Sequence, residues 1–175
     1  PNGGLSVVLA DGQRSGKSAK RISTMVVRKV ISLLAEGVRD GAAARAASDY
    51  LYAERGGQVQ ATLNILSIDM ESRTLVITRN NESPVLIVSD DQLCILDEES
   101  ISVGIYRNTR PVITEMPLEV GLTAVVYTDG MVYAGERAAQ KLDIPTLLVN
   151  LLEDDPSAQY LADQLMERAL KALSL

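Results

Sequence analysis

The sequence predicts an α+β protein in which helices pack on the outer faces of mainly antiparallel sheets. Three observations support this class. One strand precedes two helices, about six short strands follow in a single block, and two further helices close the chain. The expected strands are alternating or short apolar runs bounded by turn residues, whereas the helical segments repeat apolar residues every three or four positions. Strands gathered in one block, apart from paired helices, are typical of α+β folds.

The first part of the chain predicts one strand and two helices. Residues 5–10 form an apolar run of strand length, and residues 15–20 are a polar, glycine-containing entry to a helix. Apolar residues then recur at helical spacing, namely Ile22, Met25, Val26, Val30, Leu33 and Leu34. Gly37 ends this helix. Asp40 is expected to cap a second helix over residues 42–53, whose many alanines imply close packing on a neighbour.

Six strands and two helices are expected after Gly56-Gly57, which breaks the chain. Alternating residues from Val59 to Ile65 and a strand over residues 74–78 predict a hairpin with its turn at residues 69–72. Further strands are expected at residues 84–88, 93–96, 112–118 and 122–128, and helices at residues 145–152 and 158–173. No repeat of fixed period is visible, so we expect a single domain over residues 1–175.

Composition excludes several classes of protein. A net charge of −6, a pI near 4.7 and an aromatic content of 3% disfavour a nucleic-acid partner. No apolar stretch approaches the roughly 20 residues of a membrane span, and no secretory leader opens the sequence, so no membrane partner is expected. The one cysteine, Cys94, lies in an apolar run, which predicts a core thiol. A lone cysteine also fits the reducing cytoplasm, the location we expect.

The chain contains no histidine. This excludes Ser-His-Asp and Cys-His catalysis, histidine-ligated zinc and a histidine general base. With only one cysteine, sites for soft metals are excluded as well. Any metal chemistry must therefore use oxygen ligands, which suit Mg²⁺ or Mn²⁺.

Two Asp-Gly pairs each follow a strongly apolar run. Asp11-Gly12 ends the run from Val7, and Asp129-Gly130 ends the run from Ala124. An acid at a strand tip can project into a cleft, while the following glycine lets a backbone carbonyl come close. Two such tips could together hold a divalent cation. Asp-Gly is also a common turn sequence, so a plain loop is the alternative for either copy.

Residues 12–18, with the sequence GQRSGKS, suggest a second alternative. They resemble the phosphate-binding loop G-x-x-x-x-G-K-[ST] and lie between an expected strand and an expected helix. However, three residues separate Gly12 from Gly16 where that loop needs four, and Asp11 would repel an anion. The chain also lacks the βαβ alternation of a parallel sheet. A nucleotide-binding switch is therefore the remote alternative.

Five segments together carry a more specific resemblance. They are ADG-x-x-SG-x-x-A at residues 10–19, QATLNI at 60–65, NNESP at 80–84, SVGI at 102–105 and TDGM at 128–131. In this order they resemble the motifs of bacterial type 2C (PPM) Ser/Thr protein phosphatases, in the RsbX/SpoIIE-like group and most like a stressosome phosphatase. Asn81 stands where that group usually has glycine or serine, and Ser102 replaces a proline.

The resemblance implies an α-β-β-α sandwich of two mainly antiparallel sheets flanked by helices, with two Mn²⁺ or Mg²⁺ ions in a cleft between the sheets. Asp11 would bridge the two cations, the carbonyl of Gly12 would bind one of them, and Asp129 would bind the other. A metal-activated water would attack the phosphoester, so no side-chain nucleophile and no histidine would be needed. The catalytic residues implied are thus Asp11 and Asp129.

Two further acids of the family pattern, one in a strand before the first motif and one in a last strand, have no counterpart between Pro1 and Leu175. We therefore expect a PPM-type domain that lacks the first and last strands of the family. Residues 153–155 (EDD) could be metal ligands but are more simply a solvated loop and a cap for the next helix.

The resemblance implies protein substrates, namely phosphorylated STAS-domain regulators of a stressosome-type stress response. Arg14 and Lys17, beside the expected centre, could attract a phosphorylated partner or could simply be solvated at a helix start. The alternative function is a pseudophosphatase, a binding module on the same fold without catalytic turnover.

Overall fold

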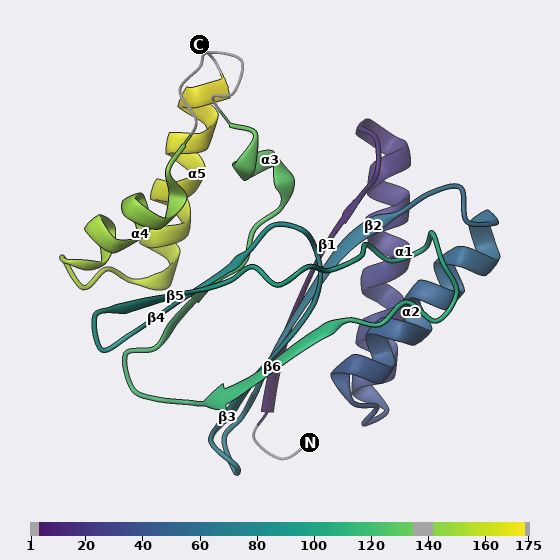
Figure 1. Ribbon diagram of the computed structural model, residues 1–175, viewed down its shortest axis with the longest axis horizontal. Helices are drawn as coiled ribbons and strands as arrows, with labels where there is room; N and C mark the ends of the chain where they lie inside the picture. Colours follow the sequence, from purple (N-terminus) through teal and green to yellow (C-terminus); the bar gives the residue numbers. More distant parts are fainter. Residues whose placement is uncertain (1–3, 135–141, 174–175) are drawn as a thin grey trace. The chain divides into compact units, whose positions relative to one another are not determined.

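The computed structural model describes residues 4–134 and 142–173, and the chain divides into two compact units (Figure 1). Unit 1 comprises residues Pro1–Glu82 and Asp97–Val120, and unit 2 comprises Ser83–Leu96 and Gly121–Leu175. Each unit has its own antiparallel sheet and its own helices. The predicted α+β class with two antiparallel sheets is confirmed. That residues 1–175 form a single domain remains a prediction.

Unit 1 contains a four-stranded antiparallel sheet with two helices on one face (Figure 1). The strand order is β1(Gly4–Gly12), β2(Ala61–Asp69), β3(Thr74–Asn80) and β6(Val112–Pro117). The helices are α1(Gly16–Ala35) and α2(Asp40–Arg55). α1 packs on β1 and β2, and α2 packs on β2 and β3. The predicted hairpin of β2 and β3 is present, with Asp69 paired to Thr74 across the turn.

The core of unit 1 lies between this sheet and the helices. Alternate strand residues such as Val8, Leu63 and Ile65 point to the helices. They meet the buried residues Ile22, Val26 and Val30 of α1 and Ala43, Ala44, Ala47 and Leu51 of α2. Small alanine side chains let α2 approach the sheet closely, as their number in the sequence implied. Burying each larger aliphatic side chain contributes about 1.5–3 kcal/mol.

The chain returns to unit 1 at Asp97, and the segment that follows packs against β2 and α2. Val103 pairs with Ala61 through two backbone hydrogen bonds of 3.0 and 2.9 Å. The next residue, Gly104, has φ +99°, and a Cβ there would lie 2.5 Å from a methyl carbon of Leu51. Its N–H donates to Oγ of the buried Ser48 at 3.1 Å. Only glycine suits this position, both by conformation and by space.

The buried Arg79, 2% exposed, fixes the points where the chain leaves unit 1 and returns to it. Its Nη1 donates to the carbonyl of Asn81 at 2.8 Å, and its Nη2 donates to the carbonyl of Glu98. The carbonyl of Arg79 itself accepts from Ser100 Oγ at 2.8 Å. Burial lowers the pKa of the guanidinium, while nearby Glu98 and Asp97 raise it. Arginine remains charged in this setting. Its charge-assisted hydrogen bonds therefore fix the backbone at Asn81, where the chain leaves unit 1, and at Glu98, where it returns.

Unit 2 contains a three-stranded antiparallel sheet in the order β5(Gln92–Leu96), β4(Val85–Ser89) and β7(Thr123–Val125). Its helices are α3(Asp129–Val132), α4(Ile144–Leu152) and α5(Ala158–Leu173), and α4 packs against α5. Its core is formed by Leu86, Tyr127, Ile144, Leu148, Leu161 and Leu165. Among the helices of residues 4–134 and 142–173, none is long and apolar enough to cross a membrane.

Three predictions about the ends of helices and strands were wrong. Asp40 is the first residue of α2 and not its cap, since Arg39 occupies the cap position without a side-chain hydrogen bond. The strand expected to reach residue 128 ends at Val125, because its partner β4 pairs only through Leu86–Val88. Residues 153–155 were expected to cap the last helix, but Ser157 does so: its Oγ accepts from the N–H of Tyr160 at 3.2 Å.

Cys94 is exposed, so the prediction of a core thiol was also wrong. It lies in β5, an edge strand of the three-stranded sheet. The burial of this strand is low throughout, because an edge strand of a small sheet is covered less than a central one. The four-residue apolar run at residues 93–96 does not distinguish the two positions.

Candidate metal centre

The first candidate ligand, Asp11, lies at the tip of β1. It pairs in register with Thr62 of β2 and is half-buried. Its neighbour Ala10 packs on the helix side of the sheet. Because strand side chains alternate, the Asp11 carboxylate lies on the opposite face, away from α1 and α2. The sheet thus presents this acid at a strand end, on the face that the helices of unit 1 leave free.

Gly12 connects the end of β1 to α1 through close packing and a hydrogen bond. A Cβ on this residue would lie 2.5 Å from the carbonyl oxygen of Ala19 and 2.8 Å from Cβ of Ile22. Its N–H donates to Oγ of Ser23 at 2.8 Å, and this hydroxyl donates to the carbonyl of Ala19 at 3.0 Å. The glycine is therefore needed for close approach and not for turning, since its φ lies outside the left-handed region.

Asn64 is a candidate site residue that the sequence analysis did not single out. It is 1% exposed, and its Oδ1 has no hydrogen-bond partner among the residues that the structure describes. Asn64 pairs with Leu9, so it lies on the same face as Asp11 and diagonal to it. Diagonal neighbours in a sheet are roughly 7–8 Å apart. The signal in the sequence was a polar residue inside the apolar run Leu63-Asn64-Ile65.

The second candidate acid, Asp129, is the first residue of α3 in unit 2. Thr128 precedes the helix in extended conformation, and the N–H of Tyr133 donates to the Asp129 carbonyl at 2.9 Å. The Asp129 side chain is exposed. Tyr127, two residues earlier, is buried in the core of unit 2, and this burial raises the pKa of its hydroxyl to about 12. The buried tyrosine anchors the segment that presents the acid.

The two Asp-Gly pairs differ in their local structure. Gly12 sits under a helix with no room for a methyl group, whereas a Cβ on Gly130 would make only an ordinary contact of 3.7 Å with Thr128. Gly130 is also helical, so it does not turn the chain. The two glycines therefore differ in the space around them and in backbone conformation.

The structure brings Asp11 and Gly12 together in unit 1 and places Asp129 in unit 2. Within residues 4–134 and 142–173, no group of three or more acidic or cysteine side chains is arranged to hold a metal. Residues Glu153, Asp154 and Asp155 are all exposed and lie between α4 and α5. The convergence of Asp11 and Asp129 on one metal centre stays a prediction.

The remaining sequence motifs have plain structural settings. Arg14 is exposed in the short loop after β1, with φ 82°, and Lys17 is exposed in the first turn of α1. The strand before this loop is paired antiparallel to β2, whereas a phosphate-binding loop of the nucleotide-binding type follows a strand of a parallel sheet. The nucleotide-binding alternative therefore has no support in the arrangement of unit 1.

Comparison with known proteins identifies the family. The family described as Stage II sporulation protein E (SpoIIE) matches residues 1–174, across both units. The chain belongs to the SpoIIE family. This confirms the resemblance to bacterial PPM phosphatases that the five motifs indicated.

Stage II sporulation protein E of Bacillus subtilis is 20% identical over 171 residues, which are 97% of this chain and 20% of that protein. The chain thus spans about a fifth of the length of this curated relative. A solved structure of the SpoIIE PP2C phosphatase domain with a fragment of its regulatory domain has a TM-score of 0.78 at 17% identity. It covers 97% of this chain and 50% of the other.

Two further solved structures share the fold. The catalytic domain of the serine/threonine phosphatase PstP in complex with two manganese ions has a TM-score of 0.75 at 16% identity, covering 95% of this chain and 81% of the other. RsbX in complex with magnesium has a TM-score of 0.74 at 15% identity, covering 99% of this chain and 78% of the other. These similarities show a PPM phosphatase fold for this SpoIIE-family chain, which is the fold of a class of hydrolases.

Proposed function

We propose that this chain is a metal-dependent protein Ser/Thr phosphatase. The observation that carries the proposal is the Asp11-Gly12 tip of β1, held in place by α1 on a chain that belongs to the SpoIIE family. Asp129, the second Asp-Gly acid, supplies the other carboxylate of the proposed centre. Both acids occur in the positions that the PPM resemblance assigns to metal ligands.

The donor set of the proposed centre fits hard divalent cations. Asp11 and Asp129 offer carboxylate oxygens, Gly12 offers a backbone carbonyl, and Asn64 offers an amide oxygen that has no partner in the part of the chain described here. Oxygen ligands of this kind suit Mn²⁺ and Mg²⁺, the ions present in the PstP and RsbX structures. When bound, a pair of such cations supplies Lewis acidity and an activated water for attack on phosphorus.

The chain's own residues would orient that chemistry. The Asp11 carboxylate would hold the cations from unit 1, and Asp129 would supply a second carboxylate from unit 2. The Gly12 carbonyl is placed by the hydrogen bond from its own N–H to Ser23 and by close packing on α1. A rigid strand tip positions ligands more precisely than a free loop. No side-chain nucleophile is assigned, in keeping with a chain that contains no histidine.

We further propose that the substrates are phosphorylated STAS-domain regulators in a stressosome-type stress response, and that the protein acts in the cytoplasm. The support is the RsbX-like character of the sequence motifs together with the RsbX fold similarity. A purified, phosphorylated STAS-domain protein is the probe. Loss of its phosphate in the presence of this chain and Mn²⁺ would support the substrate class, and retention of the phosphate would contradict it.

The test of the phosphatase itself is Mn²⁺-dependent hydrolysis of a chromogenic phosphoester. Asp11→Asn and Asp129→Asn are each expected to lower kcat/KM by about a hundredfold or more, because each removes a ligand charge. Asp90→Asn is the matched control: Asp90 is exposed, with φ 48°, a conformation that asparagine adopts readily. Equal rates for all four proteins would rule the site out.

A pseudophosphatase is the second candidate, favoured by the finding that no group of three or more acidic or cysteine side chains among the described residues is arranged to hold a metal. Such a module would bind its partner with the same affinity with and without Mn²⁺, and it would not release phosphate. Calorimetry with Mn²⁺ separates the two candidates, because the phosphatase is expected to bind Mn²⁺ through Asp11 and the pseudophosphatase is not.

A further inference from the structure

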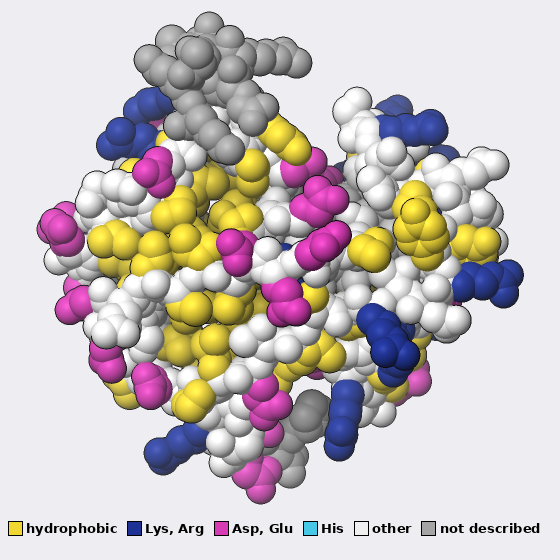
Figure 2. All heavy atoms as spheres, in the orientation of Figure 1, with side chains coloured by type: hydrophobic (Ala, Val, Ile, Leu, Met, Phe, Trp, Pro, Cys, Tyr) yellow, Lys and Arg dark blue, Asp and Glu magenta, His cyan; other side chains and the backbone are white. Residues whose placement is uncertain are grey.

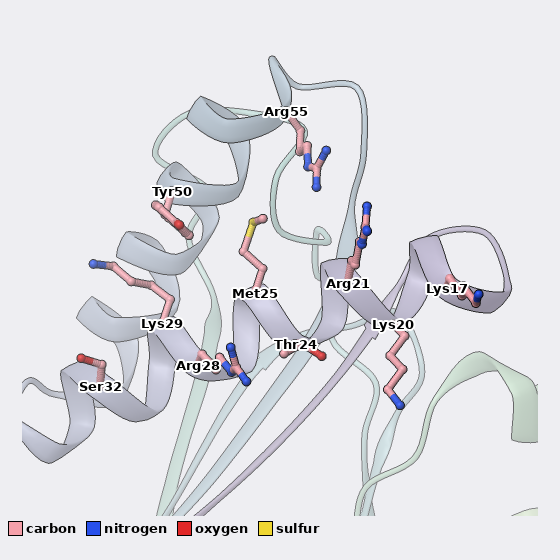
Figure 3. Close-up of a pocket in the computed structure, with 10 residues that line it drawn as sticks. All are labelled: Lys17, Lys20, Arg21, Thr24, Met25, Arg28, Lys29, Ser32, Tyr50 and Arg55. Atoms are coloured by element: carbon pink, nitrogen blue, oxygen red, sulfur yellow. The ribbon is translucent and has the colours of Figure 1, made fainter.

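A groove along α1 combines an unusual concentration of positive charge with an apolar floor. It has a volume of about 810 Å³ and is lined by eight residues of α1 and two of α2 (Figure 3). Its basic members are Lys17, Lys20, Arg21, Arg28, Lys29 and Arg55. We call this set the basic groove. Met25 and Tyr50 lie among these side chains and provide apolar surface.

This charge stands out in an acidic protein. Unit 1 contains 13 basic and 13 acidic residues, so the whole net charge of −6 belongs to unit 2, with 4 basic and 10 acidic residues. Within unit 1 the segment from Gly12 to Ala35 contains six basic residues and no acid. On the face drawn in Figure 2, Lys and Arg side chains gather over α1 and α2, while Asp and Glu predominate over α4 and α5. The basic groove is therefore a local feature and not a reflection of composition.

The arrangement is unfavourable for α1 on its own. The first turn of this helix has no acidic residue, and Lys17, Lys20 and Arg21 lie in its first two turns. Cations at a helix N-terminus oppose the helix dipole. Lys17 and Arg21 are also like charges at i and i+4, which repel by about 0.2–0.5 kcal/mol. A helix with this charge distribution is stabilised when an anionic partner lies against it.

The cations of the groove are available for such a partner. Among the described residues, Lys17, Lys20, Arg21, Arg28 and Arg55 form no ion pair, and the salt bridge present there joins Lys171 to Glu167. Lys29 lies over the ring of Tyr50, 5.5 Å from its centroid. Tyr50 itself is 38% exposed. Tyrosine and methionine are adaptable apolar contacts at binding surfaces.

We infer that the basic groove docks an acidic, amphipathic helical segment of a protein partner. From Lys17 to Lys29 the groove runs about 18 Å along α1, the length of about 12 residues of helix. Carboxylates of the partner would pair with the groove cations, and an apolar stripe would rest on Met25 and Tyr50. The low aromatic content disfavours a nucleic acid as the occupant, because it leaves few rings on which bases could stack. This inference does not depend on the proposed phosphatase activity.

The test measures binding of a fluorescein-labelled helical peptide of about 15 residues, with glutamates flanking a stripe of leucines, to the full chain. Fluorescence anisotropy is expected to show binding that weakens as NaCl is raised from about 50 to 500 mM, because added salt screens exposed charges. A peptide with the leucines replaced by serine is expected to bind more weakly, since it cannot use the apolar floor. Equal affinity of the two peptides would contradict the inference.

Two sets of three charge reversals provide a matched comparison. Arg21→Glu, Arg28→Glu and Arg55→Glu together change the groove, and Arg39→Glu, Arg45→Glu and Arg110→Glu together change a separate pocket of unit 1. All six arginines are exposed. The groove set is expected to lower peptide affinity by about a factor of ten or more, and the control set by much less. Equal losses would show that overall charge attracts the peptide and would overturn the inference.

Two further probes distinguish an acidic helix from other anionic ligands of the basic groove. A single-stranded oligonucleotide that binds as tightly as the peptide, or displacement of the peptide by millimolar inorganic phosphate, would overturn the acidic-helix inference. Circular dichroism checks that the variants fold. If the groove set unfolds, Arg21→Gln, Arg28→Gln and Arg55→Gln replace it, and unchanged affinity in that set would contradict the inference equally.

Discussion

The backbone N–H of Gly12 donates to Oγ of Ser23, 2.8 Å away, and so ties the end of β1 to the second turn of α1. The same hydroxyl donates to the carbonyl of Ala19 within the helix. Ser23 thus accepts a hydrogen bond from the N–H of Gly12, a buried donor that does not pair within the sheet. The backbone next to the proposed ligand Asp11 is positioned by a side chain twelve residues further along the chain.

Ser23→Ala is expected to lower the free energy of unfolding by about 1–3 kcal/mol, because the N–H of the buried Gly12 loses its partner. Urea denaturation followed by circular dichroism measures the change. Ser32→Ala is the control on the same helix, since the Ser32 hydroxyl is exposed and bonds Glu36 only at 3.5 Å. That control is expected to change stability by less than about 0.5 kcal/mol. A loss of the same size in both variants would contradict a special role for Ser23.

Gly12→Ala and Gly130→Ala are expected to differ, although both glycines follow an aspartate. The added Cβ at position 12 would lie 2.5 Å from a backbone oxygen of α1, so strand or helix must shift, at a cost of about 1–3 kcal/mol. At position 130 the added Cβ has room within α3, and alanine is the better helix former by about 1 kcal/mol. Thermal unfolding of both variants measures the contrast, and a stable Gly12→Ala protein would disprove the close packing described here.

Asn64→Leu is expected to leave stability without metal unchanged or raise it by up to about 1 kcal/mol, because a buried unpaired oxygen is removed. If Asn64 supports the proposed metal centre, the same change reduces the rise in Tm that Mn²⁺ produces. Thr78→Val is the matched control. Thr78 also buries an oxygen without a partner among the described residues, but it pairs with Ile65 on the helix side of the sheet. In Thr78→Val, the rise in Tm that Mn²⁺ produces is expected to equal that of the original chain.

The cap of α4 makes a pH-dependent contribution to stability. Asp143 accepts from the hydroxyl of Thr146 at 2.7 Å and from its N–H at 3.1 Å, and these bonds lower the pKa of Asp143 below 3.8. A lowered pKa means that the contribution is present above about pH 4 and is lost as the pH falls through the folded-state value. The difference in urea midpoint between the original chain and Asp143→Ala should therefore be largest at pH 5–7 and shrink towards pH 3. Asp154→Ala, in the turn after α4, controls for the loss of one negative charge. A difference that persists unchanged at pH 3 would contradict the assignment.

Much of the fold followed from periodicity and turn residues. The α1 and α2 helices and the β2–β3 hairpin lie where apolar spacing and glycine placed them, because local pattern and tertiary packing agree in unit 1. The errors occur where tertiary context decides. Cys94 is exposed because its strand is at a sheet edge, and β7 stops at Val125 because its partner strand is short. A run of apolar residues carries no information about either.

The candidate site was only partly readable from the sequence. Asp11 could be chosen because an acid follows a buried strand, but its cross-strand relation to Asn64 depends on the register of β1 and β2. The reason for Gly12 likewise lies in the contact with Ala19 and Ile22, which no local pattern specifies. Sequence reasoning finds residues whose chemistry is unusual, whereas register and helix packing determine which of them support one another.

The guanidinium of Arg79 holds the backbone on both sides of the excursion that carries β4 and β5, through Asn81 before it and Glu98 after it. The two ends of this hairpin are therefore joined through Arg79, in addition to the backbone pairing of β4 with β5. A proteolytic nick in the exposed Asp90-Asp91 turn would therefore leave two fragments that stay associated under native conditions. The exposed hairpin tip is thus the natural place to insert a reporter sequence.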